Sequence, residues 1–288
     1  MEKYIDLNRS FAPISRDHDL SEEDAFTFES LGLFEKQKWY HLLQLRRVVI
    51  LAEAGAGKTK EIRETTERLR KEGKNAFCFS LEYLGSDFQN SFIRGTEAEF
   101  TSWLSSEEEG WFFLDSVDEA KLIAPGNFNH AIRSIGTRLG ESLQRTHIFI
   151  TSRVTEWYPQ SDFALIKDRL SYKKPEETRE EETEGPYGHY GEGSSDEVRF
   201  TQKEPEPLAE PSIFSLLPLD KEQIRTYSKA HNVKQIDAFL DAIEKAEAEI
   251  FAKRPLDLDD LILYWKDNGR IANLAKLMGS SIYLKLKE

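Results

Sequence analysis

Short apolar runs alternate with helix-like patterns through most of the chain. Five of these runs have the length and continuous hydrophobicity of strands that are buried on both faces. They cover residues 48–52, 75–84, 110–114, 147–153 and 212–219. After the first run, Ile62, Thr66 and Leu69 recur at helical spacing, and Gly73 is expected to end that helix. The alternation predicts an α/β fold with a parallel sheet and helices on both of its faces.

Changes in this pattern divide the chain into domains. Residues 1–33 are polar without a clear period and are expected to be an N-terminal lead-in, before an α/β domain over residues 34–219. Within that domain, residues 173–210 are rich in Glu, Gly and Pro and cannot bury enough apolar surface to offset their chain entropy, so we expect an acidic excursion there. Residues 220–288 are expected to form a small helical domain, whose end is consistent with the start of a further domain that is cut short.

The helical domain begins with a clear start signal. Asp220 followed three residues later by Gln223 is a capping-box pattern. Further helices are predicted over residues 236–251, 254–269 and 270–288. Pro255 opens one of them, a position where proline is common for purely structural reasons.

Composition narrows the classes of partner and compartment. The net charge of −13 argues against nucleic acid or an anionic membrane as partners, because the basic residues are interleaved with acids and form no evident patch. The one cysteine, Cys78, lies in an apolar run and is expected to be a small core residue. There is no signal peptide and no apolar run of about 18 residues, so we expect a cytoplasmic protein.

The segment "LAEAGAGKT" after the first predicted strand has the pattern of a phosphate-binding loop. Such a loop needs backbone N–H groups that point into one cavity, and glycine permits the turns that achieve this. Lys58 would reach the β and γ phosphates at the start of a helix, and the Thr59 hydroxyl would hold Mg²⁺. The candidate nucleotide-binding residues are Glu53, Ala54, Gly55, Ala56, Gly57, Lys58, Thr59 and Lys60. Ala52 stands where the G-x-x-x-x-G-K-[ST] pattern has its first glycine, and a glycine turn with a chance lysine is the alternative.

Charged residues follow two other predicted strands at their carboxyl ends, where open α/β sheets bind ligands. Asp115 ends the strand in "WFFLDSVDEA" and is the candidate Mg²⁺ ligand. Asp118 and Glu119, placed on the turn that follows, are candidates to orient or deprotonate a water that attacks the γ phosphate. Arg153 after "HIFITS" is a candidate sensor of the γ phosphate. The alternatives are an acidic surface turn and an ordinary arginine in a salt bridge.

Five segments in order resemble the NACHT-type branch of the STAND signal-transduction NTPases, and most of all bacterial members, several of which act in antiviral (anti-phage) defence. The segments are "LAEAGAGKT", "FFLDSVDEA", "ITSR", "LLPLDKEQI" and "RPLDLDDLI". The resemblance covers roughly residues 34 to 280 without the acidic excursion. It implies an α/β nucleotide-binding domain with a helical lid, and a switch between ADP and ATP forms that hydrolyses slowly and oligomerises on activation.

The resemblance also implies roles for individual residues. Asp115 would be the metal acid, and Asp118 and Glu119 would be the hydrolytic acids. Arg153 would be the sensor arginine, and Pro255 would match the lid proline that packs near adenine. The preference for ATP over GTP rests on the same resemblance, since no guanine-reading N-K-x-D motif stands at the corresponding place.

Two other functions stay open at this point. One is a conventional P-loop ATPase that turns over continuously to remodel a protein or nucleic acid. The other is an interaction module that holds nucleotide without hydrolysing it. Three acids in "DSVDE" argue against the latter, because a structural site has no use for so many.

Overall fold

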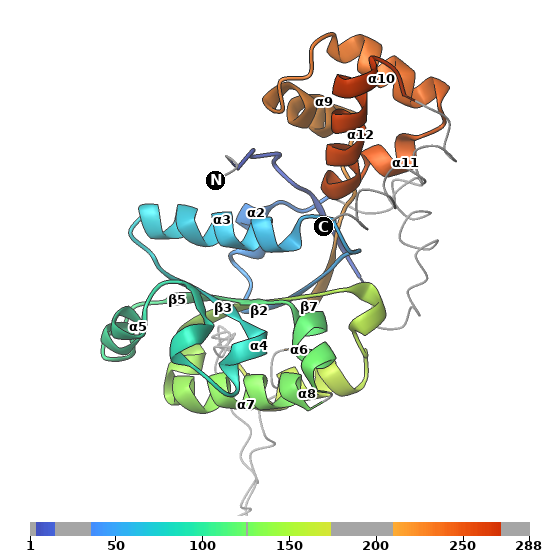
Figure 1. Ribbon diagram of the computed structural model, residues 1–288. Coiled ribbons are helices and arrows are strands. Elements are labelled where there is room, and N and C mark those ends of the chain that lie inside the picture. Colours follow the sequence, from blue (N-terminus) through green and yellow to red (C-terminus); the bar gives the residue numbers. More distant parts are fainter. Residues whose placement is uncertain (1–3, 15–35, 125, 174–209, 272–288) are drawn as a thin grey trace, which may run out of the picture.

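A seven-stranded sheet forms the centre of the computed structural model, which describes residues 4–14, 36–124, 126–173 and 210–271 (Figure 1). From edge to edge the strands are β1 (Phe11–Pro13), β7 (Ser212–Leu216), β2 (Arg47–Leu51), β6 (Thr146–Ser152), β5 (Gly110–Asp115), β3 (Asn75–Ser80) and β4 (Phe92–Arg94). The pairs from β7 across to β3 are parallel, whereas β1 and β4 are antiparallel to their neighbours. The predicted parallel sheet is therefore confirmed, and the two short edge strands are additions that the apolar pattern did not predict.

Helices cover both faces of the sheet, as predicted (Figure 1). One face carries α2 (Trp39–Leu42) and α3 (Lys58–Lys71); the other carries α4 (Leu81–Leu84), α6 (Val117–Ile123), α7 (Asn127–Leu139) and α8 (Ser161–Arg169). Beside the β4 edge lies α5 (Glu97–Leu104), and short 3₁₀ turns occupy Gln89–Ser91, Gly140–Arg145 and Val154–Glu156.

The core lies in two layers because the central strands are apolar on both faces. In β5, Phe112 and Leu114 belong to the layer under α7, and Phe113 between them belongs to the layer under α3. The Phe113 ring stacks on Phe149 of β6 at 4.8 Å between centroids. Alternate residues thus enter opposite layers, which is why these strands appear as continuous apolar runs. Cys78 of β3 is buried in the core, as predicted.

The helical unit after the sheet consists of α9 (Lys221–Ala230), α10 (Ile236–Lys245), α11 (Glu249–Ala252) and α12 (Pro255–Asn268). The capping box is confirmed: the Asp220 side chain accepts from the Gln223 N–H at 2.9 Å, and the Gln223 side chain accepts from the Asp220 N–H at 3.0 Å. Where one helix was predicted over 236–251, the chain forms two, α10 and α11. Phe239 and Leu258 lie at the centre of this unit's own apolar cluster.

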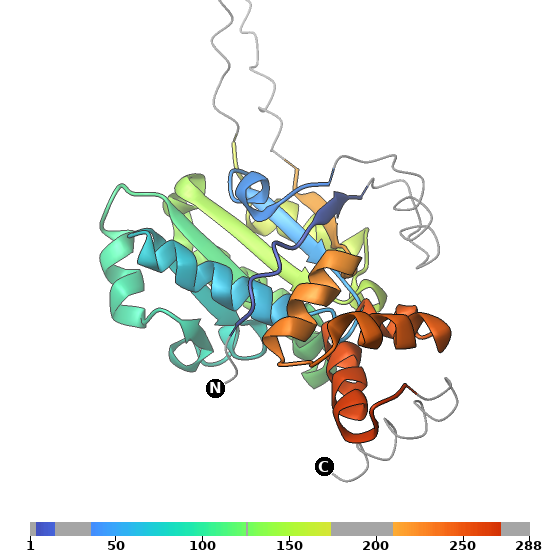
Figure 2. The same cartoon turned by 90° about the horizontal axis from the view of Figure 1, so that it is seen from above.

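The N-terminal segment, residues 4–13, crosses over α3 and joins the sheet through β1 (Figure 2). Its Leu7 is buried in the cluster of the helical unit, and its Phe11 packs edge-on against Trp39 of α2 at 4.9 Å. Part of the expected lead-in therefore belongs to the folded core. The acidic residues 174–209 and the last predicted helix, beyond residue 271, lie outside the described residues. Within the described ranges, no helix has the length and hydrophobicity needed to cross a bilayer.

Candidate functional site

The predicted phosphate loop connects β2 to α3. Gly55 and Gly57 have φ angles of +75° and +94°, in the left-handed region that glycine enters without a steric cost. The Ala56 N–H donates to the Glu53 carbonyl at 3.3 Å, and Ala54 is exposed at the tip of the turn. The loop thus delivers the chain directly into the N-terminus of α3, whose first N–H groups have no partner within the helix.

Lys58 is the first residue of α3, and its side chain returns over the loop. Its Nζ donates to the Ala52 carbonyl at 2.8 Å and to the Glu53 carbonyl at 3.1 Å. Burial lowers the pKa of Lys58, and the charge of Asp118 is the strongest influence in the opposite direction. The lysine is therefore a partly desolvated cation held beside the predicted acid cluster.

The first turn of α12 lies directly on the phosphate loop. The Leu256 N–H donates to the Gly55 carbonyl at 3.3 Å. A Cβ atom added to Gly55 would lie 2.9 Å from the Leu256 Cβ, so only glycine fits at this contact. A Cβ on Gly57 would lie 3.6 Å from the ring of Pro255, the residue that the resemblance placed near the nucleotide base. The helical unit therefore touches the loop through residues 255 and 256.

Asp115 and Thr59, the two candidate Mg²⁺ ligands, are in contact. Thr59 Oγ1 donates to Asp115 Oδ1 at 3.1 Å, and the Thr151 hydroxyl donates to the same oxygen at 3.0 Å. The Arg63 guanidinium of α3 lies 3.7 Å from the other carboxylate oxygen. Burial raises the pKa of Asp115, whereas the two hydroxyl donors and Arg63 oppose that rise. Thr151 and Arg63 were not predicted, because no local pattern marks them.

Ser116 bends the chain sharply after β5. Its φ of +68° lies in the left-handed region, which costs a residue with a side chain about 1 kcal/mol. The Ser116 N–H donates to Thr151 Oγ1 at 3.0 Å, which holds this conformation in place. The predicted turn is wrong here: Asp118 and Glu119 lie in the first turn of α6, so a helix N-terminus adjoins the acids. Backbone strain of this kind gathers at functional sites.

Asp118 is buried, with an exposed fraction of 4%, and is only half paired. Its Oδ2 lies 2.7 Å from Arg153 Nε, which brings together the predicted acid and the predicted sensor. Its Oδ1 has no hydrogen-bond partner among the described residues. Glu119 is exposed, and desolvation together with the charges of Asp115 and Asp118 raises its pKa. A buried carboxylate oxygen without a partner calls for an explanation, and a bound polar ligand is one.

A small cavity of about 110 Å³ adjoins the loop at Gly57. It is closed by residues from four separate parts of the chain, namely Tyr4, Leu7, Arg9, Gly57, Lys60, Tyr227 and Pro255. Of these, sequence reasoning identified the loop residues and Pro255. The others come from the N-terminal segment and from α9, whose approach to the loop is a consequence of the tertiary fold.

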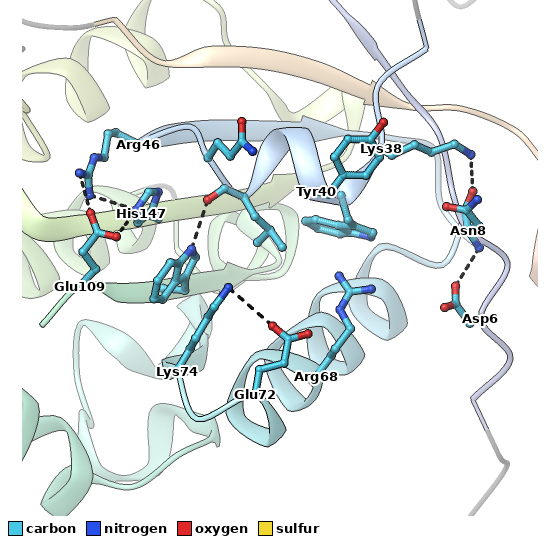
Figure 3. A pocket seen from close by; sticks show the side chains of 14 residues that line it. Asp6, Asn8, Lys38, Tyr40, Arg46, Arg68, Glu72, Lys74, Glu109 and His147 are labelled. Carbon is cyan, nitrogen blue, oxygen red and sulfur yellow. Dashed lines mark hydrogen bonds and ion pairs between the residues drawn. The ribbon is translucent and has the colours of Figure 1, made fainter.

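A larger hollow of about 670 Å³ lies at the opposite edge, where the strands begin (Figure 3). Several of its charges are paired: Arg46 lies 2.7 Å from Glu109, and Lys74 lies 3.6 Å from Glu72. The His147 ring stacks on another lining residue, Trp111, at 4.9 Å. None of the predicted site residues lines this hollow.

Metal binding by protein groups alone has little support. Across the described ranges, no three His, Cys, Asp or Glu side chains are grouped so as to hold a metal ion. A threonine hydroxyl with one aspartate nevertheless suits Mg²⁺, which keeps several waters and is usually bound together with substrate phosphates.

No family model matches the chain, and no curated protein matches it by sequence.

Proposed function

We propose that this protein binds ATP with Mg²⁺ at the carboxyl edge of its sheet, hydrolyses it slowly and acts as a switch of the NACHT-type STAND class. The observation that carries the proposal is the contact between Thr59, at the start of α3, and Asp115, at the end of β5. Two motifs that are 56 residues apart meet there as a hydroxyl and a carboxylate. Any two turns after parallel strands share this edge of the sheet, but a chance glycine turn and an unrelated acidic turn would not need to place a hydroxyl and a carboxylate in hydrogen-bond contact.

The phosphates would lie against the loop. The backbone N–H groups around Gly55 and Gly57, the N-terminus of α3 and the Lys58 ammonium supply positive charge there. Thr59 and Asp115 would hold Mg²⁺, which neutralises phosphate charge when bound. The base would enter the cavity beside Gly57 and Pro255.

Asp118, Glu119 and Arg153 supply the groups for hydrolysis. Glu119 is exposed and its pKa is raised, which makes it a better acceptor for a proton from the attacking water. Asp118 is held by Arg153 and retains one oxygen to orient that water. The Arg153 guanidinium would stabilise the charge that develops on the γ phosphate.

The contact of α12 with Gly55 favours a switch over a continuously cycling ATPase. A change in the loop on nucleotide exchange would act directly on Leu256 and Pro255, and through them on the helical unit as a lid. By resemblance, the active form would self-associate in antiviral signalling.

The test is to identify the nucleotide that copurifies with the protein and to measure turnover. Denatured protein is analysed by chromatography and mass spectrometry, and a thermal melt is recorded with and without Mg-ATP. Retained ADP, a melt shifted upward by Mg-ATP and slow hydrolysis support the switch. Fast, continuous turnover would instead favour a remodelling ATPase. Binding without turnover would favour a nucleotide-holding module, and the absence of any binding would refute the proposal.

A further inference from the structure

Arg9 is a buried arginine whose partners lie at two functional positions. It belongs to the N-terminal segment and has an exposed fraction of only 2%. Its Nη1 donates to the Ala56 carbonyl of the phosphate loop at 2.9 Å, and its Nη2 donates to the Leu217 carbonyl at 2.7 Å. Burial lowers the pKa of Arg9, and the nearby Glu61 carboxylate is the largest opposing influence. Placing a cation here is costly, so its contacts need a reason.

A second buried arginine shows what a purely structural arrangement looks like. Arg47 at the start of β2 is also buried and also donates to carbonyl groups. Its Nε donates to Leu170, its Nη1 to Thr146 and its Nη2 to Leu143, so every nitrogen is used. Arg9 differs, because its buried Nε has no hydrogen-bond partner among the described residues. Stability alone would favour the completely satisfied arrangement.

The bond to Ala56 determines how the next peptide N–H is oriented. In a trans peptide the carbonyl of one residue and the N–H of the next point in opposite directions. Arg9 holds the Ala56 carbonyl, so the Gly57 N–H is turned away from Arg9. Gly57 has a φ of +94° and no side chain, so its backbone has little intrinsic preference for this orientation. A Cβ on Gly57 would lie 3.5 Å from Arg9 Nη1, so the guanidinium lies directly behind the loop.

The bond to Leu217 reaches the connection between the sheet and the helical unit. Leu217 follows the last residue of β7, and two residues later the Leu219 N–H donates to the Lys253 carbonyl at 2.8 Å. The Gln223 side chain of α9 donates to the Leu7 carbonyl at 2.9 Å, two residues before Arg9. The same segment therefore holds the phosphate loop, the connection and the first helix of the helical unit.

We propose that Arg9 is a positioning residue for nucleotide binding, which holds the Gly57 N–H toward the phosphates and couples the loop to the connection at Leu217. The inference rests on the proposed nucleotide site. It assigns to residues 4–10 a role in transmitting nucleotide occupancy to the helical unit, beyond their role in the core.

The experiment compares Arg9→Met with Arg47→Met in the full chain. Both variants lose buried hydrogen bonds to carbonyls, but only the first alters the loop and the cavity beside it. We expect affinity for Mg-ATP, measured by titration calorimetry on folded protein, to fall roughly 10- to 100-fold in Arg9→Met. In Arg47→Met it should stay within about twofold of wild type, because that arginine lies at the other edge of the sheet. Equal losses in both variants, or no loss in either, would overturn the inference.

Hydrogen exchange separates positioning from general stability. In the wild type, Mg-ATP should slow exchange in the loop and also in residues 217–223. In Arg9→Met, any nucleotide bound at high concentration should protect the loop without protecting the connection. Persistence of protection at 217–223 would contradict the coupling.

Arg9→Lys keeps the inference testable if the methionine variant does not fold. Lysine retains the charge but lacks the fork that reaches two carbonyls at once, so affinity should fall roughly 3- to 10-fold. Wild-type affinity and exchange in Arg9→Lys would count against the inference. If the wild type binds no nucleotide, the proposed function is refuted. If the wild type and the variants bind nucleotide equally well, only the inference about Arg9 is refuted.

Discussion

The two edges of the sheet differ in how completely their polar groups are satisfied. At the amino edge, a hollow of about 670 Å³ has several of its lining charges in ion pairs, as Arg46 is with Glu109. At the carboxyl edge the cavity is about 110 Å³, yet Asp118 keeps a buried oxygen without a partner in the described part of the chain. Of these two cavities, the one at the amino edge is the larger. Unused hydrogen-bonding capacity and raised carboxyl pKa values select the carboxyl edge, which is the more specific indication of a site.

The polarity of the helices explains part of this difference. At the amino edge helices end, and their last carbonyls need donors. Arg47 donates to Leu170 at the end of α8, and the Trp111 indole donates to Leu43 at the end of α2. Side-chain donors at this edge thus satisfy carbonyl groups at the ends of helices. At the carboxyl edge helices begin, and their free N–H groups attract an anion.

The largest difference is expected in the rate of ATP hydrolysis, between variants of one glutamate at each edge. Glu119→Gln should lower the rate of ATP hydrolysis about 100- to 10,000-fold, the usual range for loss of a general base. Glu109→Gln at the amino edge should leave the rate within about twofold. Steady-state phosphate release measures both. An unchanged rate in Glu119→Gln would favour the module that only holds nucleotide.

Two lysines, one at each edge, should differ in how their substitution affects nucleotide binding. Lys58→Ala should abolish the upward shift of the melting temperature by Mg-ATP, because in the proposed site the ammonium is the loop's charged contact to phosphate. Without nucleotide, its fold should persist with a loss of about 1 kcal/mol from the bonds to Ala52 and Glu53. Lys74→Ala, whose lysine pairs with Glu72 at the amino edge, should keep the wild-type shift. Equal shifts in the two variants would refute the role of Lys58.

The contact between the loop and α12 can be isolated with two glycines. Gly55→Ala should lower the free energy of unfolding by roughly 2–4 kcal/mol, from its positive φ and from the clash with Leu256. Gly73→Ala has a similar φ of +78° but nothing within 4 Å, so it should cost only about 1 kcal/mol. Urea unfolding measures both changes.

A double variant tests where the extra cost arises. Adding Leu256→Gly to Gly55→Ala should recover part of the difference between the two glycines, since it removes the Leu256 Cβ that lies 2.9 Å from the added Cβ. If the double variant is destabilised by the full sum of the two single changes, α12 does not rest on the loop as described.

The smallest expected effect is on how the free energy of unfolding depends on pH, through His147 at the amino edge. Burial lowers the pKa of His147, so the unfolded chain binds a proton more readily than the folded protein. Stability from this group is present above the unfolded pKa of about 6.5 and declines as the pH falls below it. His147→Gln should flatten that decline by up to about 1 kcal/mol between pH 8 and pH 5.5. Urea unfolding at both pH values measures it, and a steeper decline in the variant would reverse the sign of the argument.

Local patterns along the chain predicted most of the sheet and proposed part of the candidate site. Gly55, Gly57 and Lys58 were identifiable because phosphate binding needs those residue types at that spacing. The strand β4 was missed, because three residues at an antiparallel edge give no period to detect. The helix that carries Asp118 and Glu119 was predicted as a turn. It begins directly after Ser116, whose left-handed conformation is held by a bond to the distant Thr151, and the local sequence does not reveal that bond.

The sequence alone determined the parallel α/β sheet, because strand and helix patterns alternate along the chain. It also determined the glycine loop after β2 and the capped start of α9, because each depends on residues that are close together in the chain. Tertiary structure alone decided that Thr151 and Arg63 flank Asp115, and that Arg9 lies behind Gly57. The same is true of the bond from Arg9 to Leu217, which joins groups 208 residues apart. Their positions follow from how strands are ordered across the sheet, and no periodic pattern along a chain encodes that order.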